Sequence, residues 1–499
     1  MRKKRLLYNT VSSLGLQVIT VISGLILPKL IMLSYGSGVN GLVNSIAQFL
    51  GFITILELGV GAVVQSALYK PLATNDTNLL SAVLCSAQQY FRKIGIILLL
   101  YIIGLCIVYP LFINGVFSKG YTVTLIISMS LSYFAQYYFG IVDGLLLSAD
   151  QRGYIQYIAQ SITVISNTTA CMFLINNGFG IQAVKACTSI LYIVRPILIH
   201  FYITRNYCIN RKIIFEKEPI EQKWNGIAQH IASFVLDGTD IIVLTLFSTL
   251  SNVSIYSVYH MVVYGVKLLF LSMTNGIQAL LGEMWAKNEY TGLSQTFAKI
   301  EWTIHTSVVL LFGCTASLIV PFIGVYTYGI TDANYRMPVF ALLITVANLM
   351  HGLRIPYNLM IMAANQYKTT QNNYLIAALL NIVISVLLVR DFGLVGIAIG
   401  TLVAMLYQTL WMEWYCSKNI IVRNKTIFIR QVFVDFVIFM FAYFLSSYIN
   451  LDVFSYFNWA IMAVKIFAIW AMVSLTINFI FYKGRFNEYI KQMIKKLKR

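Results

Sequence analysis

Long apolar segments follow one another along the whole sequence, separated only by short polar stretches. Most of them reach or exceed the roughly 20 residues that a helix needs to cross a bilayer. Open strands would leave backbone groups unpaired in lipid, so helices are the structure that suits these segments. The approximate spans are 10–34, 39–67, 92–113, 121–148, 154–176, 179–203, 225–250, 253–285, 303–325, 337–363, 372–389, 394–416, 431–450 and 457–482. The sequence therefore predicts an all-α polytopic membrane protein with about 14 transmembrane helices.

Composition leaves little room for anything besides these helices. The 499 residues are 59% hydrophobic and 11% charged, whereas a soluble domain carries about 25% charged residues. The seven cysteines contain no C-x-x-C pair, so neither a disulfide framework nor a zinc site is expected. The motifs G-x-x-x-x-G-K-[ST], H-E-x-x-H and G-x-S-x-G do not occur in the sequence. We therefore expect a chain that is not an enzyme and that carries no cofactor and no bound metal.

The placement of the basic residues gives the topology. The formal net charge is +18, a value that by itself would suit a nucleic-acid-binding protein. If the N-terminus is cytoplasmic, however, the cytoplasmic segments hold 27 of the 36 Lys and Arg residues, and the external loops hold Lys119, Arg336 and Arg390. This is the asymmetry of the positive-inside rule. It predicts that both termini are cytoplasmic and that no nucleic acid is bound.

The two halves of the sequence resemble each other at a spacing near 214 residues. Gly51 matches Gly265 and Asn167 matches Asn381. Weaker matches near this spacing are Ala149-Asp150-Gln151 with Ala364-Asn365-Gln366, Phe179 with Phe392, Asn9 with Asn225, and Pro110 with Pro321. Because the spacing covers six helices, an even number, the repeats have the same orientation, as in transporters with parallel repeats. The expected architecture is two parallel-repeat six-helix bundles plus two extra C-terminal helices.

This repeat predicts how the chain divides. The expected parts are an N-terminal bundle at 1–203, a cytoplasmic linker at 204–224, a C-terminal bundle at 225–417, and two extra helices with a basic tail at 418–499.

Basic side chains near the middle of predicted spans are the first group of candidate site residues. A charge at the bilayer centre costs roughly 2.5–3.5 kcal/mol or more, so such a residue should face water or a partner. Lys267 and Arg354 lie centrally in the second half, and a guanidinium suits bidentate binding of phosphate oxygens. They are candidates to bind an anionic head group, or alternatively to pair with Asp237 and Asp240. Arg195 is a weaker candidate, because it precedes Pro196 and is consistent with a helix kink alone.

Polar stripes on the same spans add two more substrate-binding candidates. Asn358 lies one helical turn beyond Arg354, and Gln65 shares a face of the second span with Glu57 and Gly61. Side chains on such a stripe are expected to line a water-filled cleft.

Acidic side chains form the second group of candidates. Glu57, Asp237 and Asp240 lie near mid-span, and Asp143 lies nearer the cytoplasmic side. A carboxylate removed from water can titrate near neutral pH, so these residues are candidates for coupling transport to protons or sodium. The alternative is that each belongs to a structural ion pair.

Residues 36–73 resemble one known family. Their sequence is GSGVNGLVNSIAQFLGFITILELGVGAVVQSALYKPLA, in which Glu57, Gly59, Gly61 and Gln65 form a glycine-flanked turn with a polar exit. This segment resembles the Wzx-type polysaccharide flippases, which export O-antigen or capsule repeat units. They belong to the superfamily that also holds multidrug extruders and lipid II flippases. The number of spans, the parallel repeat and the two extra C-terminal spans agree with that superfamily over the whole chain.

The resemblance implies a function. It implies a bacterial cytoplasmic-membrane flippase that moves undecaprenyl-diphosphate-linked oligosaccharide from the inner to the outer leaflet by alternating access. Lys267 and Arg354 would then meet the diphosphate. The first half departs from a cationic lining, since it offers Glu57 and Asp143 instead.

The resemblance also implies partners for the chain, and other functions stay open. The expected partners are a lipid-linked oligosaccharide, a coupling proton or sodium ion, and the polymerase and chain-length proteins of a glycan pathway. The alternative functions are a cation-coupled extruder of small molecules and, from another class, a membrane-embedded glycan polymerase or transferase.

Overall fold

The described chain is built from helices. The computed structural model describes residues 2–57, 60–113, 116–211, 213, 220, 227–451 and 453–483, and no strand occurs among them. The chain divides into two compact units, Met1–Ser254 and Ile255–Arg499. The all-α prediction is confirmed. The four sequence-based domain ranges stay a prediction.

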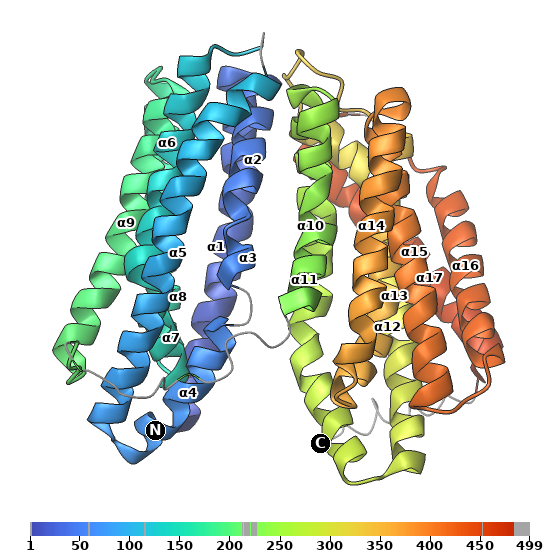
Figure 1. The fold of residues 1–499 in the computed structure, drawn as a ribbon. Coiled ribbons are helices and arrows are strands. Elements are labelled where there is room, and N and C mark those ends of the chain that lie inside the picture. The colour runs from blue at the N-terminus through green and yellow to red at the C-terminus, as the bar shows by residue number, and fades with distance from the viewer. Residues whose placement is uncertain are drawn as a thin grey trace. The chain divides into compact units, whose positions relative to one another are not determined.

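The first unit consists of α1 to α10, with one π-helical segment, η1 (Figure 1). Within it α1 packs against α8, α6 against α9, and α8 against α9. The helices are α1 (Arg2–Tyr35), α2 (Ser37–Gly51), α3 (Thr54–Glu57), α4 (Val60–Thr74), α5 (Thr77–Phe112), α6 (Lys119–Ala135), η1 (Gln136–Gly140), α7 (Ile141–Ala149), α8 (Gly153–Asn176), α9 (Ile181–Asn206) and α10 (Ile227–Phe247).

The second unit contains most of α11 and all of the later helices. Within it α13 packs against α12 and α15, and α14 packs against α15. The helices are α11 (Leu250–Ala286), α12 (Tyr290–Tyr326), α13 (Pro338–Ala363), α14 (Tyr367–Phe392), α15 (Leu394–Asn419), α16 (Thr426–Ser446) and α17 (Tyr456–Phe481).

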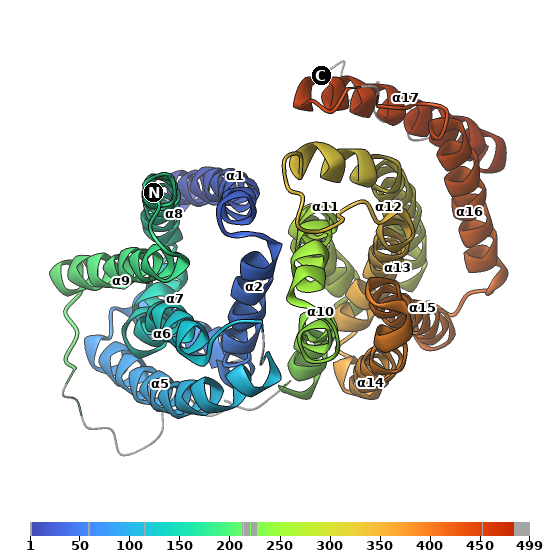
Figure 2. The ribbon, with the colours of Figure 1, turned by 90° about the horizontal axis from the view of Figure 1, so that it is seen from above.

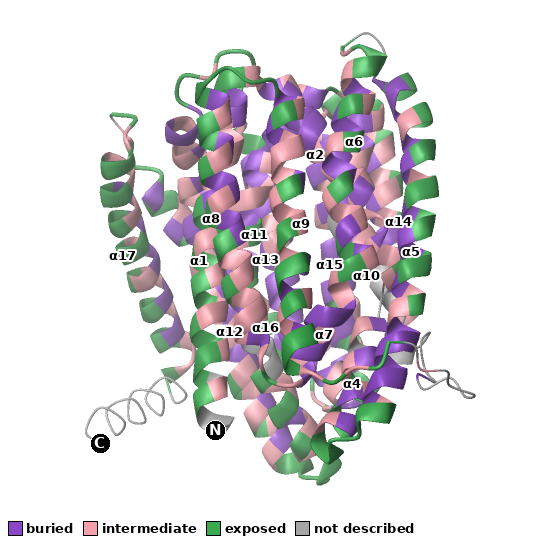
Figure 3. Cartoon of the chain, turned by 90° about the vertical axis from the view of Figure 1, so that its left-hand side faces the viewer, coloured by how far each residue is buried: buried purple, intermediate pink, exposed green. Residues whose placement is uncertain are grey.

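The exposed surface of the helices is strongly apolar. Large hydrophobic side chains such as Leu100, Phe173 and Val464 are at least 66% exposed, and exposed residues follow the lengths of α1, α9 and α17 (Figure 3). In water this surface would be unstable, but in a bilayer it is the expected one. Thirteen helices among the described residues are long and apolar enough to cross a membrane. The predicted seventh span corresponds to α10, of which Gly238–Phe247 is a shorter apolar stretch.

Two predicted spans are not continuous α-helices. The predicted span 39–67 contains α2, α3 and α4, with a break at Phe52 and Ile53; Gly59 of the predicted glycine-flanked turn lies outside the described residues. The predicted span 121–148 contains the five-residue π-helix η1 between α6 and α7. Such π-helical turns are frequent at functional sites because they redirect the side chains of the wall they interrupt.

The internal repeat is visible in the backbone of each unit. Helices α9 and α15 both have 26 residues, and their first residues, Ile181 and Leu394, are 213 positions apart. Left-handed conformations recur at similar spacing: Asn75 has φ 54° and Asn288 φ 57°, while Gln151 and Asn365 both have φ 58°. Non-glycine residues adopt this conformation rarely. Its recurrence in matching helix-to-helix turns supports a duplicated helical unit.

The two extra helices lie at the edge of the second unit, where α16 and α17 form a pair (Figure 2). Both pack against α12. A Cβ added to Gly313 of α12 would lie 2.0 Å from the Trp470 ring of α17, so only glycine admits that ring. The buried residues of α17 are Met462, Ile466, Trp470, Ser474 and Asn478, a stripe at four-residue spacing. Among the described residues, the buried side chains of α17 thus lie on one narrow face.

Candidate functional site

The second unit holds a group of buried basic residues. Lys267 on α11 and Arg354 on α13 are 6% and 7% exposed, and both lie within candidate membrane spans. The guanidinium of Arg354 lies 5.5 Å from the centre of the Tyr374 ring, and Nζ of Lys267 lies 5.8 Å from that of Tyr264. His351, one turn before Arg354, is within electrostatic range of both cations. Helices α11 and α13 therefore bring the two predicted basic residues to one region.

The neighbours of Arg354 are neutral. Its Nη1 donates to Oε1 of Gln408 on α15, and among the described side chains it forms no ion pair. The Tyr374 hydroxyl donates to Oδ1 of Asn358 at 3.1 Å. Tyr374 therefore contacts both Arg354 and Asn358, so the structure brings these two predicted residues to the same place.

Several buried polar atoms around Arg354 have no hydrogen-bond partner. They are Nε of Arg354, Nδ1 of His351 and Nε2 of Gln408. Most buried polar groups in proteins are satisfied, so each exception calls for an explanation such as bound water or a ligand. We refer to Lys267, His351, Arg354 and Gln408 as the cation cluster. Within it, Nε of Arg354 and Nε2 of Gln408 are donors without an acceptor, which suits an anion.

The first unit holds a cavity of about 390 Å³ between α3, α6, η1 and α9. Glu57 lies in its wall and accepts a hydrogen bond of 3.0 Å from the Tyr137 hydroxyl. Nη2 of Arg195 donates to Oε1 of Gln136 at 2.6 Å, and Nε of Arg195 is buried without a partner. The other lining residues are Thr54, Met129, Ser132, Tyr133, Lys185, Thr188, Ser189 and Tyr192. The break after α2 and the π-helix η1 supply Glu57, Gln136 and Tyr137 to this cavity.

The remaining candidates lie elsewhere. Gln65 on α4 donates to the Tyr69 hydroxyl at 3.2 Å and is not among the lining residues of the cavity. Oδ2 of Asp143 lies at a hydrogen-bond distance of 2.7 Å from Nδ1 of His200, and Oδ1 lies 3.8 Å from Nη2 of Arg211. It therefore belongs to an ion pair between α7, α9 and the following segment.

The acidic pair predicted on the seventh span is described only in part. Asp240 is 3% exposed on α10 and has an interaction partner. The side chain of Asp237 lies outside the described residues. The predicted pairing of these residues with Lys267 and Arg354 stays a prediction.

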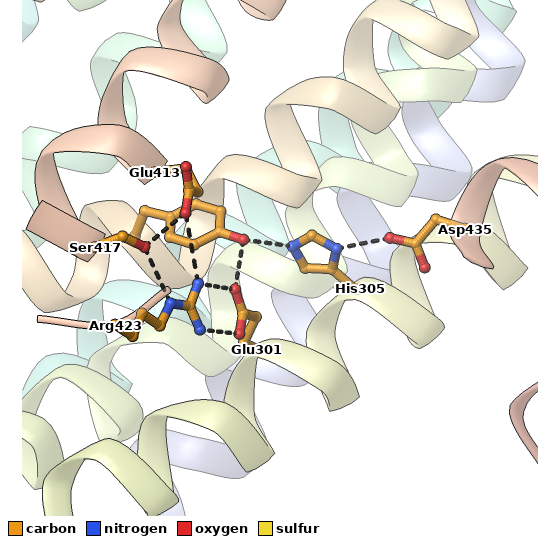
Figure 4. Close-up of polar contacts among 7 residues, drawn as sticks. Glu301, His305, Glu413, Ser417, Arg423 and Asp435 are labelled. Atoms are coloured by element: carbon orange, nitrogen blue, oxygen red, sulfur yellow. Dashed lines mark hydrogen bonds and ion pairs between the residues drawn. The ribbon is translucent and has the colours of Figure 1, made fainter. Parts of the chain in front are cut away.

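Sequence reasoning missed a second buried ionic group, which we call the α12–α16 network. It consists of Glu301 and His305 of α12, Tyr357 of α13, Glu413 and Ser417 of α15, Arg423 of the following loop, and Asp435 of α16. Figure 4 shows Arg423 between Glu301 and Glu413, with His305 beside Asp435. Glu301, Glu413 and Asp435 are 3%, 4% and 4% exposed, and His305 is fully buried.

At one end of this network, Arg423 contacts both Glu301 and Ser417. Its Nη1 and Nη2 each lie 2.5 Å from a different oxygen of Glu301. Its Nε donates to Oγ of Ser417, which donates in turn to Oε1 of Glu413. Burial by itself lowers the pKa of the Arg423 guanidinium, but the hydrogen bonds and charge of Glu301 outweigh burial and raise that pKa above its ordinary value. Arg423 is therefore a permanent cation.

The other end of the network is a chain of hydrogen bonds. The Tyr357 hydroxyl donates to Oε1 of Glu301 at 2.6 Å and lies 3.2 Å from Nε2 of His305. Nδ1 of His305 lies 2.7 Å from Oδ2 of Asp435, whose Oδ1 accepts from Gln431 at 3.0 Å. One signal in the sequence could have indicated this network. Glu301 and His305, Glu413 and Ser417, and Gln431 and Asp435 are all spaced four residues apart, so each pair shares a helix face.

The sequence matches no protein-family model and no curated protein. The structure is similar to the lipid II flippase MurJ in an inward closed conformation, with a TM-score of 0.70 and 14% identity over 96% of this chain and 99% of that chain. The chain therefore has a MurJ-like fold.

The same fold occurs in transporters of the MOP superfamily. An inward-facing multidrug resistance MATE family transporter gives a TM-score of 0.53 with 15% identity, over 83% of this chain and 95% of that chain. VcmN, a MATE transporter of Vibrio cholerae in its bent form, gives 0.52 with 13% identity, over 83% and 94%. The MATE matches leave about a sixth of this chain uncovered, whereas the MurJ match covers nearly all of it.

Proposed function

We propose that this chain is a flippase that moves an oligosaccharide linked to undecaprenyl diphosphate across the bacterial cytoplasmic membrane. Movement is from the inner to the outer leaflet, by alternating access, and serves the synthesis of O-antigen or capsule. The polymerase and chain-length proteins of that pathway are the proposed partners. Both termini are proposed to be cytoplasmic, from the distribution of basic residues.

The observation that carries this proposal is the cation cluster. Two basic side chains are buried within membrane-spanning helices, and Arg354 is held by the neutral amide of Gln408. Keeping a charge in such a place is costly, and intramembrane charges generally mark a substrate or ion pathway. A diphosphate provides an oxygen acceptor of the kind that Nε of Arg354 lacks. The fold of a protein named as a lipid II flippase supports the same class of function.

The first test is transport of a phosphate-bearing lipid by purified protein in vesicles. A labelled monosaccharide on a prenyl diphosphate is compared with the same sugar on a prenyl monophosphate, and leaflet orientation is followed with a membrane-impermeant reagent. Loss of a hydrogen bond to a charged group costs roughly 1.5–3 kcal/mol, so Arg354→Ala should slow diphosphate transport about 10- to 100-fold. Arg354→Lys should recover only part of the rate, because lysine keeps the positive charge but cannot bind two phosphate oxygens with a planar guanidinium.

The matched control is Arg390→Ala, which removes an exposed arginine at the end of α14. It should transport the lipid like the unaltered protein. Full activity of a folded Arg354→Ala protein, or equal transport of the two lipids, would contradict the diphosphate site.

A second candidate function, a cation-coupled extruder of small molecules, is favoured by the first unit. Its cavity places the carboxylate of Glu57 among Tyr133, Tyr137 and Tyr192, and aromatic rings with a carboxylate suit organic cations. The two functions separate in cells. Deletion of a flippase should accumulate glycan-loaded lipid on the inner leaflet, whereas deletion of an extruder should cause drug hypersensitivity with intact surface glycan.

A further inference from the structure

The hydrogen bonds of the α12–α16 network fix where its protons are. Tyr357 has a single hydroxyl proton, which it donates to Glu301. The contact between the Tyr357 oxygen and Nε2 of His305 can therefore be a hydrogen bond only if Nε2 carries the proton and donates it. Nδ1 of His305 then faces Oδ2 of Asp435 at 2.7 Å. A hydrogen bond there requires one more proton, carried by either His305 or Asp435.

The charges of the network lead to the same result. Glu301 is neutralised by the bidentate guanidinium of Arg423. Glu413 lies 3.8 Å from Arg423 and within the electrostatic influence of Lys425. Asp435 has no basic residue at salt-bridge distance among the described side chains except His305. Because a buried charge must be paired or neutralised, His305 and Asp435 together must hold the extra proton.

We propose that Glu301, Tyr357, His305 and Asp435 form a proton-binding site, and that its proton and Arg423 compete for Glu301. The ligand of this site is a proton. The inference goes beyond the proposed function, because the network shares no residue with the cation cluster and its chemistry does not depend on which molecule is transported.

The exchange starts when the loop that carries Arg423 moves and withdraws the guanidinium from Glu301. Glu301 is then a buried carboxylate without a cation. The Tyr357 hydroxyl proton passes to Oε1 of Glu301, and the Nε2 proton of His305 passes to the Tyr357 oxygen. The proton between His305 and Asp435 then lies on Nδ1, so His305 ends as a neutral imidazole that donates to the Asp435 carboxylate. No proton enters or leaves in this step, and the charge of the four groups is unchanged.

Return of Arg423 reverses the exchange. The guanidinium can pair with Glu301 only after the carboxyl proton has left, either back through Tyr357 to His305 or to water. The position of the loop between α15 and α16 is thereby linked to the position of one proton.

The groups that face this site come from every element around it. Helix α12 contributes Glu301 and His305, and α13 contributes Tyr357. Helix α15 contributes Glu413 and Cys416, the loop Arg423 and Lys425, and α16 Asp435. Helix α17 meets α12 nearby through a neutral hydrogen bond, from Trp302 to Asn478.

The test is infrared spectroscopy of the purified full chain in lipid nanodiscs, read through the C=O band of protonated carboxyl groups. Arg423→Met should show one additional protonated carboxyl at pH 7, which Arg423→Met with Glu301→Gln should lack. In the Arg423→Met background, Tyr357→Phe should delay the appearance of this band after a pH jump at least tenfold, because only the hydroxyl is lost. Absence of the band, or equal rates with Phe at 357, would overturn the proposal.

A second measurement needs no change at Arg423. Between pH 8 and pH 5.5, His305→Gln should change the number of protons taken up per molecule by about one relative to the unaltered chain. Glu283→Gln is the control, since Glu283 is 62% exposed at the side chain and paired with Lys287 outside the network. An unchanged proton count in His305→Gln would overturn the proposal even if transport of lipid is normal. A loss of lipid transport in Arg354→Ala with an intact proton count would leave this site standing and concern only the cation cluster.

Discussion

Replacing Arg423 by Met should lower the free energy of unfolding of the second unit more than the replacement of an exposed residue does. The side chain of Arg423 is 8% exposed and that of Glu301 4% exposed, and two contacts of 2.5 Å join them. Removing one partner leaves a buried carboxylate without a cation, which typically costs about 3–5 kcal/mol. Methionine keeps much of the volume of the arginine stem, so the loss should report charge rather than packing.

The assay is equilibrium unfolding of the purified protein in detergent, followed by tryptophan fluorescence. Arg423→Met combined with Glu301→Gln should recover most of the loss, because the uncompensated charge is gone. Lys287→Met is the matched control: Lys287 and Glu283 are also 2.5 Å apart, but both are exposed. It should leave stability unchanged.

The cost of Arg423→Met should also depend on pH. An unpaired buried carboxyl prefers its protonated form, so the deficit should be smaller at pH 5.5 than at pH 8. A deficit under 1 kcal/mol at pH 8, or a double variant no more stable than Arg423→Met alone, would refute this account of the pair.

Two further predictions concern packing and helix ends. Gly313→Ala should cost about 1–3 kcal/mol, because its Cβ would meet the Trp470 ring at 2.0 Å; Gly104→Ala, where a Cβ meets open space, should be neutral or stabilising in the same thermal unfolding assay. Asn9→Ala should cost about 1 kcal/mol, because Asn9 accepts from the Tyr154 N–H at 2.7 Å and donates to the Gln151 carbonyl at 3.1 Å. Asn177→Ala, whose side chain bonds only a carbonyl of its own helix, should change stability less than Asn9→Ala does.

The helices could be predicted from the sequence because the solvent leaves the backbone no other choice. A run of apolar residues in a bilayer must satisfy its own N–H and C=O groups, so the number of helices and their approximate limits follow from hydropathy. The duplication was also readable, since positions such as Asn167 and Asn381 carry the same residue. Both are buried, and Asn381 bonds Thr401 on the next helix.

The interruptions inside the predicted spans could not be recognised in the sequence. Residues 51–56 remain largely apolar through the break at Phe52 and Ile53, and the tyrosines of η1 are as compatible with an α-helix as with a π-helix. Hydropathy measures only the cost of contact with lipid, and a backbone whose polar groups are satisfied by neighbouring helices is not visible to it. The cavity beside Glu57 depends on both interruptions and therefore could not be predicted.

The α12–α16 network was missed for a different reason. Glu301 and Arg423 lie just outside the predicted spans, and Glu413 lies near the end of its span, where a charge is inexpensive because it can reach the interface. The sequence does not show that the loop after α15 folds back and buries Arg423 against α12. Only the tertiary contact converts three ordinary interfacial charges into a buried network.

The partner of each of three arginines, Arg423, Arg354 and the half-buried Arg195, indicates what that arginine can do. Arg423 is bound by a carboxylate, so its charge is already cancelled and it acts within the protein. Arg354 and Arg195 are instead held by the amides of Gln408 and Gln136, which fix the guanidinium and leave its charge intact. In both, Nε is buried without a partner.

These two amide-held arginines occupy related places in the two units. Arg195 and Gln408 are 213 positions apart, the spacing that relates the first residues of α9 and α15. In the first unit the guanidinium is on α9 and the amide on η1; in the second unit the amide is on α15 and the guanidinium on α13. Helices α9 and α15 thus carry opposite members of such a pair at equivalent positions, whereas Gln136 and Arg354 are 218 positions apart and do not follow the repeat spacing. A neutral amide provides positional restraint at little electrostatic cost, so this arrangement keeps an uncancelled cation inside each unit, where a carboxylate in place of the amide would remove it.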